Sequence, residues 1–187
     1  MNILHGLTGS VASTVVDKFK KPYENHSIKF ISTESSKHFN PPYYMLTSYD
    51  MKQDGQLRFG HFDDEDEWAM YEKESKVLHI ELVKWADVFV IAPCSANTLA
   101  KIANGICDNL LTCVARAWDF EKKFVIAVAM NTKMWEHPIT KEHLDKVKSW
   151  GIEVVDPVEK TLFCGDTGMG AMANIDDIFK NINTFEK

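Results

Sequence analysis

Val88-Phe89-Val90-Ile91-Ala92 is a continuous apolar run that lies between Asp87 and Pro93. A strand with one solvated face would alternate apolar and polar residues, whereas a strand covered on both faces reads as an unbroken apolar run. Both faces of a sheet are covered mainly when its strands are parallel and joined by helices. The run therefore predicts the central strand of a parallel sheet with helices on both faces.

Short apolar runs alternate with segments of helical periodicity on either side of this strand. Strands are expected over 3–7, 27–32, 124–128 and 153–155, and helices over 11–20, 96–103, 109–118, 140–150 and 175–185, with two short helices between 67 and 85. Residues 39–66 contain prolines, glycines and many polar residues without a clear period, so we expect a long irregular connection there. Strands alternating with helices predict a single α/β domain over 1–187, Rossmann-like or flavodoxin-like.

Composition narrows the classes of partner. The chain has 187 residues and a formal net charge of -6, and it has no basic stripe that could neutralise the phosphates of a nucleic acid. Its start lacks the pattern of a secretory signal, and no stretch is apolar for long enough to cross a membrane, so a cytoplasmic protein is expected. The four cysteines form no C-x-x-C pair, so we expect reduced thiols and no metal site.

Two loops that follow expected strands have the composition of ligand sites. In an open parallel sheet, ligands bind beyond the carboxyl ends of the strands. The first loop, 6–12, reads Gly-Leu-Thr-Gly-Ser-Val-Ala, and its N–H groups and the following helix start favour an anion such as a phosphate. The second, 93–98, reads Pro-Cys-Ser-Ala-Asn-Thr, with hydroxyl and amide groups that suit a polar ligand. Both loops also fit a plain turn or a helix cap.

Three separate side chains are candidates for chemistry. Asn131 lies among methionines and a tryptophan, and its NH₂ group can donate to a carboxylate. His79 lies at the expected start of a helix, whose dipole disfavours the imidazolium and leaves a neutral base. Cys164 opens a glycine-rich stretch that suits a mobile clamp. A packed core around Asn131, a structural histidine and a plain glycine-rich loop remain open as alternatives.

Taken together, these segments resemble the family of homo-oligomeric flavin-containing Cys decarboxylases, and most closely its phosphopantothenoylcysteine decarboxylases of coenzyme A synthesis. The resemblance runs from Gly6 to about Ala173. It is carried by 79–82 (His-Ile-Glu-Leu), 95–98 (Ser-Ala-Asn-Thr), 105–112 (Gly-Ile-Cys-Asp-Asn-Leu-Leu-Thr), 130–135 (Met-Asn-Thr-Lys-Met-Trp) and 164–166 (Cys-Gly-Asp). Several independent motifs in the order of the family make a chance match improbable.

The resemblance implies FMN as the cofactor, and decarboxylation of 4′-phosphopantothenoylcysteine to 4′-phosphopantetheine as the reaction. It implies that His79 is the base, Cys164 the proton donor and Asn131 the group that binds the substrate carboxylate. Thr161, Phe163 and Met172 would flank the substrate, through a flexible clamp near 161–173. The residues implied for the FMN site are Gly9, Ser10, Val11, Ser32, Thr33, Glu34, Ser95, Ala96, Asn97, Thr98 and Ala129.

The resemblance also implies a homotrimer with shared active sites, in which His79 faces Asn131 and Cys164 of the partner subunit. Two positions depart from the family pattern. Val128 stands where relatives usually have proline, and Thr161 stands where many have a basic residue that suits the substrate phosphate. Three alternatives remain: a regulatory relative that inhibits a protein phosphatase, a flavin prenyltransferase of similar fold, and a peptidyl-cysteine decarboxylase.

Overall fold

The computed structural model describes residues 1–39, 59–69, 76–161, 165 and 167–184. Six strands form one parallel sheet: β1 (Asn2–Leu7), β2 (Ser27–Ser32), β3 (Phe59–Phe62), β4 (Val88–Cys94), β5 (Lys123–Val128) and β6 (Glu153–Val155). Their spatial order is β3-β2-β1-β4-β5-β6. This is the Rossmann order, in which the direction of winding reverses between β1 and β4. The predicted parallel α/β sheet is confirmed.

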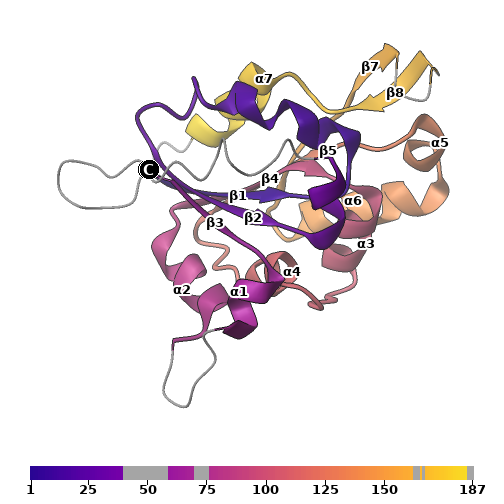
Figure 1. Cartoon of the computed structure of the whole chain (residues 1–187). Coiled ribbons are helices and arrows are strands. Elements are labelled where there is room, and N and C mark those ends of the chain that lie inside the picture. Colours follow the sequence, from indigo (N-terminus) through magenta and orange to yellow (C-terminus); the bar gives the residue numbers. More distant parts are fainter. Residues whose placement is uncertain (40–58, 70–75, 162–164, 166, 185–187) are drawn as a thin grey trace.

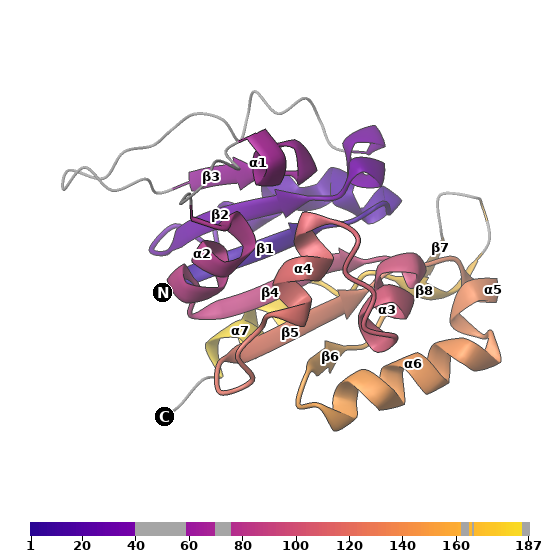
Figure 2. The same ribbon diagram turned by 90° about the horizontal axis from the view of Figure 1, so that it is seen from below.

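Helices cover both faces of the sheet (Figure 1). One face carries the 3₁₀ helix η1 (Val11–Phe19) and α7 (Ile175–Asn183). The other carries α2 (Leu78–Trp85), α3 (Ala96–Ala103), α4 (Leu110–Arg116) and α6 (Pro138–Ser149), which Figure 2 shows in front of the sheet. The short helices η2 (Glu34–His38), α1 (Asp64–Ala69) and α5 (Thr132–Trp135) lie at its margins, and β7 (Val158–Thr161) pairs with β8 (Thr167–Ala171) as an antiparallel hairpin.

The central strand β4 divides the hydrophobic core in two. Phe89 and Ile91 pack with α2, α3 and α4, whereas Val88 and Val90 pack with η1 and α7. Successive side chains of a strand point to opposite faces, so both faces of β4 need apolar residues. All seven residues of the strand are buried, as its continuous apolar run predicts.

The structure corrects the expectation of an irregular connection over 39–66. Its described part contains β3, which pairs with β2 at the sheet edge, and α1 begins at Asp64 rather than within the expected 67–85 helices. A four-residue edge strand is too short to show an alternating period. The glycine-rich stretch is also more regular than expected, since 167–171 form β8.

None of the helices in the described ranges is long and apolar enough to cross a lipid bilayer.

Candidate active site

A cavity of about 580 Å³ lies beyond the carboxyl ends of β1, β4 and β5, next to the point where the winding reverses. Ligands of open parallel sheets bind at this point, and the volume lies within the range of cofactor sites. The β7–β8 hairpin and α5 form its other wall. The predicted site residues that line the cavity are Gly9, Ser10, Val11, Ser95, Ala96, Asn97, Ala129, Asn131, Thr161 and Met172.

Thr8, which sequence reasoning missed, joins the first two loops of the cavity. Its buried hydroxyl donates to the carbonyl oxygen of Pro93 at 2.8 Å and accepts from the N–H of Ser95 at 2.9 Å. Because Gly9 and Ser10 follow directly, this bridge fixes the spacing between the two loops that line the cavity. The sequence feature that could have indicated this role is a threonine placed directly before the loop glycine Gly9.

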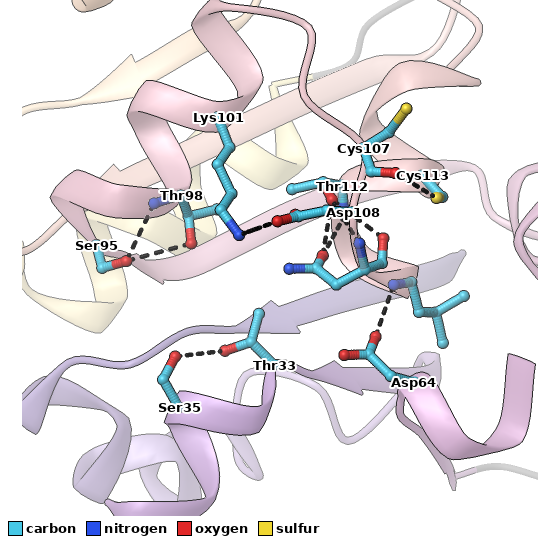
Figure 3. A network of polar contacts seen from close by, with 12 residues as sticks. Thr33, Ser35, Asp64, Ser95, Thr98, Lys101, Cys107, Asp108, Thr112 and Cys113 are labelled. Carbon is cyan, nitrogen blue, oxygen red and sulfur yellow. Dashed lines mark hydrogen bonds and ion pairs between the residues drawn. The ribbon is translucent and has the colours of Figure 1, made fainter.

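The Ser95 loop combines helix capping with a place in the cavity wall. The Ser95 hydroxyl accepts from the N–H of Thr98 at 3.3 Å and donates to the Thr98 hydroxyl at 3.2 Å (Figure 3). Ser95 therefore caps α3, while Ala96 and Asn97 in the first turn also face the cavity. Thr98 is buried and lies outside the cavity lining.

The structure does not place Ser32, Thr33 or Glu34 in the cavity wall. The Ser32 hydroxyl lies 2.9 Å from Nε2 of His61. Glu34 is exposed and forms an ion pair with Lys37. Thr33 is buried, and its hydroxyl lies 3.2 Å from that of Ser35.

After β2 the chain turns into η2, and this turn brings Ser35 to the cavity instead. The approach is close, because a Cβ atom added to Gly9 would lie 2.5 Å from the Ser35 hydroxyl oxygen. The predicted loop is thus near the site, but the residues that reach the cavity are Ser35 and Phe39, which follow it in the chain.

The residues of this cavity fit FMN. Gly9 contributes its backbone N–H and Ser10 its hydroxyl before η1, and Ala96 and Asn97 lie in the first turn of α3, so two helix starts supply the donors that a phosphate requires. Ala96 and Ala129 are small and leave room for a flat ring, and methionines add apolar, polarisable surface. The cavity therefore has a polar end for a phosphate and an apolar part for the flavin ring.

Asn131 lies on the cavity wall at the start of α5. Its side-chain oxygen accepts from the N–H of Lys133 at 2.8 Å, which orients the NH₂ group as the donor end of the amide. The neighbouring Met130 N–H donates to the carbonyl oxygen of Gly170 at 2.9 Å, so this loop is tied to β8. Val128, at the position of the usual proline, is buried as the last residue of β5.

His79 lies in the first turn of α2, as predicted, but it is not among the residues that line the cavity. Its Nδ1 lies 2.6 Å from Oε1 of Glu67, and its backbone N–H donates to Oε2 of the same carboxylate at 3.1 Å. The imidazole therefore lies next to a carboxylate as well as the positive end of the helix dipole. The carboxylate of Glu67, which no sequence motif connects with His79, also acts on this ring.

Two predicted residues, Phe163 and Cys164, lie outside the described residues. Thr161 is exposed at the end of β7, where its hydroxyl lies 3.1 Å from that of Thr167, and Met172 is buried. Of the described cysteines, Cys94 is closest in sequence to a cavity loop. Burial raises the pKa of its thiol to about 12, so Cys94 stays protonated at neutral pH.

Comparison with protein families identifies residues 1–186 as a match to the model named Flavoprotein. Among curated proteins, the chain is 44% identical over 185 residues to phosphopantothenoylcysteine decarboxylase HAL3b of Glycine max, covering 98% of this chain and 82% of the relative. It is 42% identical over 185 residues to phosphopantothenoylcysteine decarboxylase of Mus musculus, covering 96% of this chain and 84% of the relative.

Solved structures give the same picture. A PPC decarboxylase mutant complexed with pantothenoylaminoethenethiol matches with a TM-score of 0.88 and 42% identity, over 98% of this chain and 97% of that one. An FMN-binding protein, AtHal3, matches with a TM-score of 0.83 and 42% identity, over 98% and 95%. The peptidyl-cysteine decarboxylase EpiD matches with a TM-score of 0.76 at 26% identity, over 97% of each chain.

Proposed function

The chain belongs to the Flavoprotein family, and from this membership we propose that it catalyses the FMN-dependent decarboxylation of 4′-phosphopantothenoylcysteine to 4′-phosphopantetheine in coenzyme A biosynthesis. The observation that carries this proposal is the similarity of nearly the whole chain to phosphopantothenoylcysteine decarboxylases, at more than 40% identity. The similarity to the peptidyl-cysteine enzyme is lower, at 26%.

FMN is the cofactor, as the family and the FMN-binding relative indicate. When bound, it supplies the electron-accepting chemistry that loss of carbon dioxide from an unactivated carboxylate requires. We assign the phosphate to the loops of Gly9, Ser10 and Ser95, where two helix starts meet. Ala96 and Ala129 border the space for the ring.

Asn131 binds the substrate carboxylate in this proposal. The contact from Lys133 N–H identifies the side-chain oxygen as the accepting end of the amide, so the nitrogen is the end that can donate to an anion. Met130 beside it is buried and contributes apolar surface, which strengthens such a bond by excluding water. Met172 and Thr161 border the same space and would contact the rest of the substrate.

His79 is the proposed base and Cys164 the proposed proton donor, and we propose that they meet across subunits of a homotrimer. The supporting observation is that His79 is absent from the cavity lining of a single chain, although a base must reach the proton that it removes. In the trimer, His79 would complete the site that contains Asn131 and Cys164 of the partner subunit. Sedimentation of the holoprotein measures the assembly directly.

The reaction is tested with purified protein, FMN and 4′-phosphopantothenoylcysteine. The expected product, identified by mass spectrometry, is 4′-phosphopantetheine with release of carbon dioxide. A peptide that ends in cysteine serves as the competing substrate, and faster turnover of this peptide would refute the proposed substrate. A protein that stays colourless after addition of FMN would refute the cofactor.

Shared sites are tested by mixing two inactive variants. His79→Asn and Cys164→Ser each remove one proposed group, so co-refolded mixtures should regain activity in sites that combine one intact residue from each chain. Neither variant alone should be active. No recovery in a mixture that sediments as one oligomer would show that each chain completes its own site.

A further inference from the structure

The carboxylate of Glu67 contacts His79 twice. Oε1 lies 2.6 Å from the ring nitrogen Nδ1, and Oε2 accepts from the backbone N–H of the same residue at 3.1 Å. The two side chains are largely removed from solvent, with 11% of Glu67 and 24% of His79 exposed. The 2.6 Å contact is as short as the charge-assisted hydrogen bonds of proteins, which are shorter and stronger than hydrogen bonds between neutral groups.

The contact determines which ring nitrogen carries the proton. An ionised carboxylate only accepts hydrogen bonds, so Nδ1 must be the donor in a contact with Oε1. In the neutral imidazole the other nitrogen, Nε2, then has the lone pair and is the basic atom. No second hydrogen-bond partner of the ring lies among the residues that the structure describes.

The backbone contact fixes the position of Glu67 relative to α2. Val77, at the amino end of α2, provides no side-chain cap, and Glu67 takes over this function from the neighbouring helix α1. Orphan N–H groups at a helix start are satisfied by such acceptors, and a negative charge there is favourable. The carboxylate therefore holds the backbone and the ring of His79 at the same time.

Two other members of the acidic run 63–67 (Asp-Asp-Glu-Asp-Glu) hold the start of α1 in place. Asp64 accepts from the N–H of Leu110 at the amino end of α4, at 2.7 Å, as the contact at Asp64 in Figure 3 shows. Asp63 pairs with Lys37 of η2 at 3.1 Å. Asp63 and Asp64 thus contact two different elements, and these contacts hold the start of α1, the helix that carries Glu67.

We propose that Glu67 is a positioning residue, which holds the imidazole of His79 with Nδ1 protonated and presents Nε2 as the base. The proposal rests on the proposed function, because it gives His79 the role of base there. Glu67 touches neither cofactor nor substrate in this proposal, and it acts through the ring alone.

The test compares Glu67→Gln with Glu65→Gln in the FMN-bound protein. The ring and the backbone N–H contact different oxygens of Glu67, and glutamine, which has the size of glutamate, places an acceptor at only one of these two positions. Glu65 is exposed on the same helix, and its replacement by glutamine removes the same charge. The control variant therefore separates loss of charge on α1 from loss of the contact to His79.

The first measurement is the ¹⁵N–¹H correlation spectrum of the imidazoles, with His79→Asn used to assign the signal. The wild type and Glu67→Ala should differ: Nδ1 carries the proton in the wild type, and the population with Nε2 protonated rises when the carboxylate is removed. Glu67→Gln should move in the same direction, and Glu65→Gln should match the wild type.

The second measurement is turnover. We expect kcat of Glu67→Gln to fall roughly 10- to 100-fold with little change in KM, because loss of an orienting partner impairs a general base and leaves substrate contacts intact. Glu67→Asp keeps two acceptor oxygens and should recover part of kcat.

Two results would overturn the role of Glu67: a wild-type ring with Nε2 protonated, or a Glu67→Gln enzyme with unchanged kcat and an unchanged imidazole spectrum. A lower thermal stability with an unchanged spectrum and kcat would show that Glu67 acts only as a helix cap. If the wild type releases no carbon dioxide, the proposed function fails, while the imidazole spectrum still decides whether Glu67 sets the tautomer.

Discussion

Acidification should weaken the fold through His5, a buried histidine of β1. Its Nε2 lies 2.6 Å from the carbonyl oxygen of Ala92, and its Nδ1 lies 3.0 Å from the hydroxyl of Tyr23. The ring is neutral in this arrangement, donating to Ala92 and accepting from Tyr23. Burial lowers the pKa of His5 from 6.5 to about 4, against the smaller opposing effect of the bond to Ala92.

Whether acid stabilises or destabilises the fold depends on which state, folded or unfolded, binds the proton more readily. Below its ordinary pKa of 6.5, His5 is protonated in the unfolded chain but stays neutral in the folded chain until the pH approaches about 4. Proton uptake therefore favours unfolding as the pH falls through this window. Between about pH 7.5 and about pH 5, these two pKa values correspond to a loss of about 2 kcal/mol in the free energy of unfolding.

The measurement is urea unfolding at both pH values, at one protein concentration and with the same FMN content. Other titrating groups contribute equally to the wild type and to His5→Gln, so the difference between their pH dependences isolates this imidazole. The variant should lose about 2 kcal/mol less than the wild type on acidification. Tyr23→Phe leaves the imidazole of His5 buried, so this variant should retain most of the wild-type pH dependence.

Parallel pH dependences of the wild type and His5→Gln would refute this reasoning. If His5→Gln does not fold, the imidazole of the wild type can be titrated directly by NMR. A midpoint near the ordinary value of 6.5 would then show that burial does not keep the ring neutral.

Three further predictions, one of them with a matched control variant, test local features by their effect on stability or FMN binding. Gly170→Ala should lower the free energy of unfolding in urea by roughly 3 kcal/mol, because φ is +139° and the new Cβ would lie 2.2 Å from a carbonyl oxygen. Gly151→Ala, at φ +90° with no atom within 4 Å of the new Cβ, is the control and should lower it by about 1 kcal/mol. Equal losses would exclude the clash at Gly170. Asn109→Ala removes the capping box of α4 and should cost about 1 kcal/mol in the same assay; no loss would show that the cap contributes nothing. Gly9→Ala should weaken FMN binding at least about tenfold in a fluorescence titration, because its Cβ would collide with Ser35; unchanged affinity would place FMN away from this loop.

Local sequence patterns predicted a strand correctly where the whole pattern lies within that strand. The apolar run 88–92 predicts a doubly covered strand because both faces of β4 are buried, and this needs no knowledge of its neighbours. Edge strand β3 was missed because four residues, one of them glycine, carry no usable period. The hairpin partner β8 was missed because glycines at 168 and 170 indicate a loop, although pairing with β7 stabilises it as a strand.

The candidate site was predicted in part for a related reason. Gly9, Ser95 and Asn131 follow strands of a parallel sheet, whose carboxyl ends meet at one edge, so their position in the cavity wall follows from the fold class. Ser35 was missed by one position, because the turn of η2 determines which side chain reaches the cavity.

The sequence by itself determined the α/β class, the buried strands of the sheet centre and three loops that line the cavity, because these depend on periodicity and on residue type within short segments. Only the tertiary structure decided the strand order β3-β2-β1-β4-β5-β6, the bridge from Thr8 to the Ser95 loop, and the contact of Glu67 with His79. Each of these depends on how helices and loops bring separate segments together. Such distances are properties of the packed molecule, and no local pattern of residues encodes them.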